Sequence, residues 1–351
     1  MKKIIKLFLL TILPIFGISL FSGCDDNVII IKFDDTEKYE KDMSYEKEID
    51  AANCKKLKIN ANISDVEVKR TKGDLIVMEV FNKVKGENEE VVEEMLKNMD
   101  YKIERNGDTI EINSISNAKP EGIYNITAKL KVNIPEKLLL IDVITRIGNI
   151  DIDAALEKVN AETNVGNINV NLEKSKEVRL TSDTGDIRVK GQSEELNIVT
   201  RVGKIDLDMM EVVNSNIKLK IGNIDADFKK AKAIRLVSDT GDITVKGRSE
   251  KLDVITRVGE IDLDMEKLVN ANIKSEIGDV NVRLRIIDYN GEYMFGSKVG
   301  DVKIEIPKDT KVSISGLEKG NIKLDGIKLS EDGVKLYINS PSKGNVRIRG
   351  Y

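Results

Sequence analysis

The sequence repeats one short motif, a glycine followed by a polar residue and then isoleucine or valine. Nine copies lie between residues 148 and 302, at steps of 18, 19, 18, 19, 19, 18, 19 and 22 residues. A motif that recurs at a nearly fixed short interval is typical of a solenoid, in which each repeat contacts only its neighbours. The repeated glycines are Gly148, Gly166, Gly185, Gly203, Gly222, Gly241, Gly259, Gly278 and Gly300.

Alignment of the repeats on the glycine produces columns of aliphatic residues that alternate with polar ones. The positions two and four residues after the glycine are aliphatic in every repeat. This period of two predicts a strand with one face turned inward. The residue just before the glycine is Ile, Val or Thr throughout, so we expect this column to face inward as well. Because the phase of the pattern changes at the glycine, the chain turns a corner there, for which glycine supplies a positive φ.

A column of hydroxyl side chains lies three residues before the glycine. Eight of the nine repeats carry Ser or Thr at this position, and Leu219 is the exception. Inward hydroxyls stacked at about 4.8 Å can bond to one another or to the backbone along the ladder. We interpret them as structural rather than nucleophilic, because the sequence contains no histidine to act as a base.

A longer period is superimposed on the short one, since residues 234–265 nearly repeat residues 178–209 at an offset of 56. This offset spans three coils and indicates duplication of a three-coil block. Propeller blades need longer units, and leucine-rich repeats have their own Asn and Leu pattern. The sequence therefore predicts an all-β fold, a single-stranded parallel β-helix with about 18–19 residues per coil.

The solenoid begins before its obvious repeats and carries an insertion. Residues 57–68 reproduce the inward columns, with Ser64 in the glycine position. Between residues 75 and 135 the period fails, and the pattern predicts a strand, a helix over residues 87–99, a hairpin at Asn106-Gly107-Asp108 and another strand. We interpret residues 46–135 as an N-terminal coil with a small α+β cap.

The remaining residues, 136–351, form the solenoid and its closing coils. Gly320-Asn321-Ile322 and Gly344-Asn345-Val346 are degenerate copies of the corner motif, which we expect to close the stack.

The N-terminus has the layout of a secretory signal, with three lysines before an apolar run over residues 7–21. Residues 20–24, Leu-Phe-Ser-Gly-Cys, resemble the bacterial lipobox, which implies that residues 1–23 are removed and Cys24 is lipidated. Residues 24–45 would then be a polar tether, and the protein would be held at the membrane by its lipid. The alternative is an uncleaved membrane anchor with an incidental cysteine. Either reading predicts an extracytoplasmic location.

Composition disfavours several functional classes. The net charge is −4, and removal of the three lysines of residues 1–23 makes it −7, which argues against a nucleic-acid partner. The absence of histidine removes the commonest general base and zinc ligand. Polysaccharide enzymes need a cleft and usually aromatic sugar platforms, whereas this sequence has no tryptophan. We therefore expect a protein that is not an enzyme and needs no cofactor.

Four aspartates on consecutive coils are candidate calcium ligands, because they lie at outward positions three and five residues after the glycine. The alternative is a solvated acidic face, balanced by Arg188 and Lys190 on one side and Lys246 on the other. The four residues are Asp206, Asp208, Asp225 and Asp227.

The layout resembles the putative adhesin family of bacterial envelope proteins known as DUF4097, over about residues 46–351. The resemblance rests on the opening strand at residues 57–68, the Val-Asn-Ile-Pro element at residues 132–135, the serial Gly-[Asp/Asn]-Ile corners and the Gly-Asn-Val-Arg-Ile ending at residues 344–348. It implies a β-helix on a surface or membrane-anchored protein, often beside envelope-stress components. It implies no catalytic residues.

Three functional hypotheses remain open. The first is a lipid-anchored, adhesin-like envelope protein whose β-helix faces bind or scaffold an unknown envelope or surface ligand. The second is an envelope-stress sensor or a regulatory partner of a membrane protein. The third, a polysaccharide-acting β-helix enzyme, is disfavoured by the composition.

Overall fold

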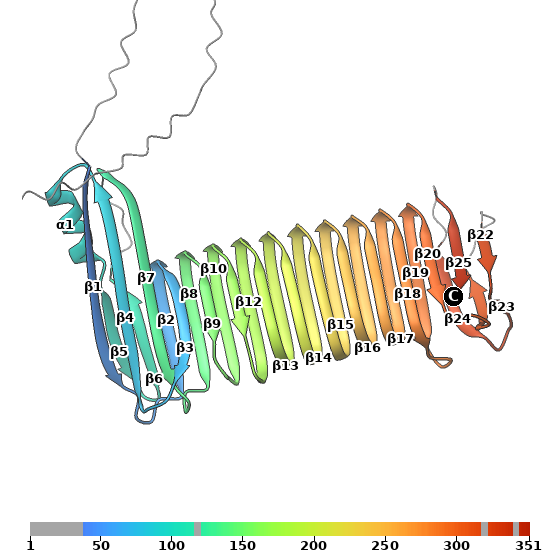
Figure 1. The fold of residues 1–351 in the computed structure, drawn as a ribbon, viewed down its shortest axis with the longest axis horizontal. Helices are drawn as coiled ribbons and strands as arrows, with labels where there is room; N and C mark the ends of the chain where they lie inside the picture. The colour runs from blue at the N-terminus through green and yellow to red at the C-terminus, as the bar shows by residue number, and fades with distance from the viewer. Residues whose placement is uncertain (1–37, 116–120, 317–321, 340–343) are drawn as a thin grey trace, which may run out of the picture. The chain divides into compact units, whose positions relative to one another are not determined.

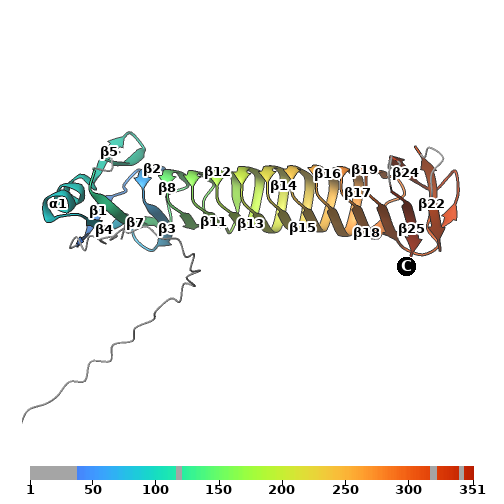
Figure 2. The ribbon, with the colours of Figure 1, turned by 90° about the horizontal axis from the view of Figure 1, so that it is seen from above.

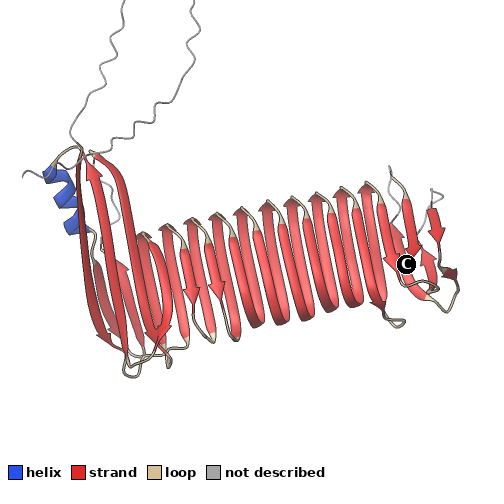
Figure 3. Cartoon of the chain, in the orientation of Figure 1, coloured by secondary structure: helices blue, strands red, loops and turns tan. Residues whose placement is uncertain are grey.

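The repeats stack as parallel coils, as predicted, and the coils follow one another along the body shown in Figure 1. The computed structural model describes residues 38–115, 121–316, 322–339 and 344–351. Three quarters of this described part is strand, and its single α-helix lies near the N-terminal end (Figure 3). The all-β solenoid expected from the sequence is confirmed, with about ten turns.

Each coil contributes one strand segment to each of two faces, seen as two rows of strands in Figure 2. The post-glycine face consists, in spatial order, of β1 (Tyr39–Asp50), β4 (Leu75–Gly86), β7 (Ile123–Pro135), β3 (Asp65–Thr71), β9 (Ile150–Asp153), β11 (Ile168–Asn171), the first halves of β13–β17, β18 (Val280–Ile287), β20 (Val302–Ile306), β25 (Val346–Gly350) and β22 (Ile322–Asp325).

The pre-glycine face consists, in spatial order, of β5 (Tyr101–Asn106), β6 (Thr109–Ser114), β2 (Lys56–Ile63), β8 (Leu140–Ile147), β10 (Lys158–Val165), β12 (Ser175–Thr184), the second halves of β13–β17, β19 (Glu292–Val299), β24 (Val334–Asn339), β21 (Lys311–Ser315) and β23 (Lys328–Leu329). Five long strands run through both faces: β13 (Ile187–Val202), β14 (Ile205–Ile221), β15 (Ile224–Thr240), β16 (Ile243–Val258) and β17 (Ile261–Ile277).

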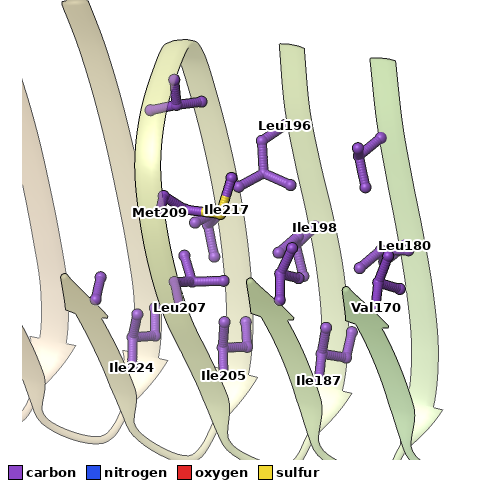
Figure 4. Close-up of a cluster of buried hydrophobic side chains, with 14 of the residues drawn as sticks. Val170, Leu180, Ile187, Leu196, Ile198, Ile205, Leu207, Met209, Ile217 and Ile224 are labelled. Atoms are coloured by element: carbon purple, nitrogen blue, oxygen red, sulfur yellow. The ribbon is translucent and has the colours of Figure 1, made fainter. Parts of the chain in front are cut away.

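The aliphatic columns after the glycine form the core. Ile187 lies opposite Ile205, which lies opposite Ile224, and all three are fully buried. Figure 4 shows these side chains in one interior row, beside the inward residues of the opposite face. The burial of aliphatic side chains, at roughly 25 cal/mol per Å² of apolar surface, is the main stabilising contribution of each added coil.

The corner glycines have φ angles between 133° and 153°. A Cβ on Gly203, for example, would lie 2.1 Å from the carbonyl oxygen of Gly185 in the preceding coil. Glycine is therefore required here both for its positive φ and for the close approach of successive backbones. Ser64 holds the equivalent place in the first coil, because a Cβ on Gly148 would lie 2.0 Å from the Ser64 carbonyl oxygen.

The expectation that the residue before the glycine faces inward is wrong. Ile147, Val165, Ile221 and Ile277 are 46–52% exposed. The chain begins to turn directly after the buried hydroxyl position, so the two residues before the glycine both lie on the outer edge of the corner. A column can thus be consistently apolar without being buried.

At the edge opposite the corner glycines, strands β13–β17 bend without a break in strand structure. Gly191 and Gly247 lie there, with φ angles of 122° and 116°, and the register shifts by one residue beside each of them. These β-bulges let a coil of 18 residues stack on one of 19. The two glycines are 56 residues apart, in agreement with the duplicated block.

The polar tether predicted for residues 24–45 is wrong at its C-terminal end. Residues 39–45 were expected to be part of it, but they belong to β1, which pairs antiparallel with β4 along its whole length. The physical reason is an alternating set of inward residues: Tyr45 and Ile49 pack against the main core, and Met43 packs against a small separate cluster.

The cap covers the first coil with strands rather than with its helix. The first coil, β2 and β3, is covered by β6 and β7. Helix α1 (Glu89–Asn98) packs instead against β1 and β4, through the small separate core that contains Val92, Met95 and Leu96.

Candidate binding surfaces

The hydroxyl column is buried and structural. Thr163 Oγ1 donates to the Gly148 carbonyl at 3.1 Å, and Ser275 and Ser297 donate in the same way to Gly259 and Gly278 at 3.0 and 2.7 Å. The sequence left open whether these hydroxyls bond to one another or to the backbone, and in these coils they bond to the backbone. The hydroxyls therefore stabilise the corners by satisfying the glycine carbonyls.

The polar residue after the glycine forms a second ladder. The Asn167 Oδ1 atom accepts from the Asp186 backbone N–H at 2.8 Å, and Asp186 Oδ1 accepts from the Lys204 N–H at 2.7 Å. Equivalent bonds join eight pairs of coils. The preference for Asp or Asn at the corners, where only Lys204 and Glu260 among the nine repeats differ, is thus explained by backbone hydrogen bonding rather than by a ligand.

The four candidate calcium ligands lie next to one another, as predicted: Asp206 opposite Asp225, and Asp208 opposite Asp227. Three of the four carboxylates face a cation, because Arg188 pairs with Asp206, Lys204 with Asp225 and Lys229 with Asp227.

The hydrogen bond to Asp225 raises the pKa of Lys204, so this lysine stays charged beside the aspartate. No group of three or more acidic or thiol side chains in the described residues is arranged to hold a metal ion. Calcium binding stays a prediction, and the geometry favours the balanced acidic face.

A groove of about 600 Å³ crosses the post-glycine face near the N-terminal end. It is lined by residues 44–46 of β1, 79–81 of β4, 129–131 of β7, 65–67 of β3, and Asp151 of β9. Pairing brings these five strands side by side, so the groove depends on the insertion of β4 and β7 beside the first coil.

The groove is acidic and has one exposed aromatic side chain. Five carboxylates and two lysines line it, together with Phe81, whose side chain is 37% exposed. Lys131 Nζ lies 2.7 Å from Glu79 Oε1, and this hydrogen bond lowers the pKa of Glu79. The carboxylates are Glu46, Asp65, Glu67, Glu79 and Asp151.

This groove could not be predicted from the sequence. Its residues come from five separate stretches of the chain between residues 44 and 151, and only strand pairing brings them together. One local signal was available: Phe81 lies between buried Val80 and buried Asn82, so the alternation of the strand turns this aromatic side chain outward.

The two cysteines differ in whether the structure describes them. Cys24 and the signal-like segment lie outside the described residues. Cys54 is a buried free thiol that donates to the Lys56 carbonyl at 3.2 Å, and burial raises its pKa. Among the described residues, none of the helical structure is long and apolar enough to span a membrane.

Comparison with solved structures found matches at low identity. A putative adhesin from Parabacteroides merdae ATCC 43184 is 14% identical, with a TM-score of 0.34, over 88% of this chain and 96% of that one. A putative adhesin from Parabacteroides distasonis ATCC 8503 is 16% identical, with a TM-score of 0.32, over 88% and 97%. A putative lipid binding protein from the same organism is 14% identical, with a TM-score of 0.31, over 87% and 96%. At these values the similarity carries no argument about ligand or activity.

Comparison with curated proteins found no match. A family model does match, over residues 54–250, from the first coil to the second copy of the duplicated block. This segment contains the Ser64 corner, the cap and the first six glycine corners, which are the features that define the fold. The chain belongs to the Toastrack DUF4097 family.

Proposed function

We propose that this protein is a non-enzymatic, adhesin-like protein of the cell envelope that contacts its ligand through the N-terminal groove. The observation that carries the proposal is the groove itself, where an exposed aromatic ring lies among five carboxylates on a sheet held rigid by its continuity with the solenoid. An exposed aromatic side chain beside charged groups is typical of contact surfaces.

The chemistry of the groove constrains its partner. The carboxylates outnumber the lysines, and Lys131 is already paired with Glu79. Because Glu67 already pairs with Lys69, a fitting ligand places cationic groups against Glu46 or Asp151 and an apolar group on Phe81. No cofactor is needed for such binding, and a nucleic acid would be repelled.

We further propose that the protein is held at the membrane by lipid on Cys24. A strand that starts at Tyr39 leaves a short linker to Cys24, so the N-terminal end of the solenoid, with its groove, would stay near the membrane. Cys24→Ala should abolish radiolabelled fatty-acid incorporation and release the protein from the membrane fraction. Unchanged incorporation would contradict this anchor.

The binding proposal is tested by complementing a deletion strain with groove variants. Deletion should abolish attachment to host or matrix material. The wild-type protein should restore attachment, whereas the variant that combines Phe81→Ser with Glu67→Lys should not. Val199→Ser is the matched control, because Val199 is a similarly exposed apolar residue far from the groove. Normal attachment with the groove variant would contradict the proposal.

The alternative, an envelope-stress sensor or regulatory partner, predicts a different outcome of the same experiment. Deletion would then alter the expression of stress genes and leave attachment unchanged. Turnover of an acidic polysaccharide by the purified protein would instead support an enzyme.

A further inference from the structure

At the C-terminal end, the order of the layers differs from the order of the chain. Strand β24 pairs with β19 on one side and with β21 on the other, although β21 precedes it in sequence. Strand β25 likewise lies between β20 and β22. Strands β24 and β25 therefore lie beneath β21 and β22, and β23 pairs with the far side of β21.

The described residues of the inserted segment, 334–339 and 344–350, continue the core and the corner of this layer. Val334, Leu336, Ile338 and Ile348 are fully buried, and Leu336 continues the inward column of its neighbours. Gly344 takes the corner position, where a Cβ would lie 2.1 Å from the Gly300 carbonyl oxygen.

The two ladders of the corner also continue through the segment. The Asn345 backbone N–H donates to Asp301 Oδ1 at 2.9 Å, and the Asn345 carbonyl accepts from the Val302 N–H at 2.9 Å. Strands β24 and β25, together with Gly344 and Asn345, thus supply core contacts and corner hydrogen bonds of the same kind as the other coils.

Both walls of this layer come from residues that precede the segment. We propose that the layer between strands β19 and β20 on one side and β21 and β22 on the other is a strand-binding slot that accepts β24 and β25 of a second copy of the chain. Exchange would preserve the hydrogen bonds and buried contacts of the segment and change only the path of the connecting residues 330–333. The partner is a second copy because its segment is identical to the one that already fits.

Concentration and opening rate govern this exchange. A short connection gives the chain's own segment an effective concentration in the millimolar range, so the monomer is favoured in dilute solution. Release of the segment breaks hydrogen bonds to two neighbours at once, so exchange is slow. Dimers formed by warming a concentrated sample and cooling it should therefore persist on dilution.

The first test supplies the segment in trans. The full chain with Leu336→Asp and Ile338→Asp cannot bury its own segment, because two carboxylates would enter the core. A fluorescent peptide of residues 334–351 should bind this variant with one-to-one stoichiometry and should not bind the wild type. The same peptide with both aspartates should bind at least about 100-fold more weakly. Absence of peptide binding to a variant whose circular dichroism shows a folded solenoid would overturn the proposal.

The second test does not depend on that variant's folding and uses the exposed pair Lys335–Glu292, whose charged atoms lie 3.8 Å apart. Glu292→Lys and Lys335→Glu each place like charges across the slot, whereas exchange between the two variants restores an opposite pair in both slots. Native mass spectrometry of a warmed and cooled mixture should show mixed dimers in excess of the statistical ratio. A mixture that stays monomeric, or dimers without that excess, would overturn the proposal.

Discussion

At the residue scale, the corner glycine is the position that tolerates change least. Gly203 combines a φ of 151° with a carbonyl oxygen 2.1 Å from where a Cβ would be placed. Gly203→Ala should therefore lower the free energy of unfolding by about 3 kcal/mol, because both the backbone strain and the clash must be relieved. Urea denaturation followed by circular dichroism measures this change.

Gly73 provides the control that separates strain from clash. Its φ is 126°, but a Cβ there would meet no atom within 4 Å. Gly73→Ala should cost only about 1 kcal/mol. Equal losses for the two variants would show that close stacking at the corner is not what selects glycine.

The hydroxyl column offers a second matched pair. Ser182 and Ser238 occupy equivalent places in the duplicated block and are both buried. Ser182 Oγ donates to the Gly166 carbonyl at 3.2 Å, whereas Ser238 Oγ has no hydrogen-bond partner. Ser182→Ala should cost about 1 kcal/mol and Ser238→Ala should be neutral or slightly stabilising, measured by thermal melts. A larger loss at Ser238 would contradict this assignment.

The individual columns show what sequence could and could not predict about single residues. Glycine and the buried aliphatic positions follow from sterics and alternation, so they were predicted correctly. The exposed stripe before the glycine was not, because Ile147 and its equivalents are as apolar as any core residue. Alternation assigns a face only while the strand is regular, and it fails where the chain turns.

At the scale of elements, helix α1 is a separable unit. Its buried residues pack in a small core of their own, apart from the main core of the solenoid. Val92→Ser should therefore release the helix while the melting temperature of the coils stays unchanged, because no column of the solenoid is interrupted. Hydrogen exchange of α1 amides against those of β13–β17 measures this.

The control for the helix variant is Val254→Ser, in the core of the stack. Val254 is fully buried and should cost about 2–4 kcal/mol when it is replaced by a smaller polar residue. If Val92→Ser lowered the melting temperature of the coils as much, the cap and the solenoid would be one cooperative unit.

The acidic pair of strands β14 and β15 permits a direct test of calcium binding. Three of the four aspartates face Arg or Lys, so their charges are already compensated. We expect millimolar calcium and a chelator to leave the melting temperature unchanged. A saturable rise with calcium, lost in Asp206→Asn combined with Asp225→Asn, would show that the ion binds.

The ends of the chain show why the order of elements was harder to predict than their existence. Strands β4–β7, the helix and the hairpin of the cap were expected near their observed places, whereas strand β1 was not. The position of residues 334–350 beneath the preceding coil was not, because every coil presents the same apolar columns to both neighbours. Any order of coils satisfies such a pattern. At the N-terminal end the groove likewise depends on the pairing of β7 with β4 and β3, which the pattern does not specify.

At the scale of the whole molecule, stability is the sum of contacts between adjacent coils. Each coil contributes buried aliphatic residues, one corner glycine and two ladders of side-chain hydrogen bonds to its neighbours. A linear array of this kind has no distant part that can compensate for a damaged coil. The body is therefore suited to hold a surface such as the groove in a fixed orientation.

The central claim is that successive coils of 18 or 19 residues lie directly over one another, and distances between spin labels test it most directly. Ile144, Val199 and Lys274 lie in one outward column, with Val199 three coils after Ile144 and Lys274 four coils after Val199. At about 4.8 Å per coil, backbone separations of about 19 Å for Val199 with Lys274 and about 34 Å for Ile144 with Lys274 are predicted. Pulsed electron paramagnetic resonance should give two narrow distributions near these values. Equal distances for the two pairs, or broad distributions unrelated to the number of coils, would contradict the stacked solenoid.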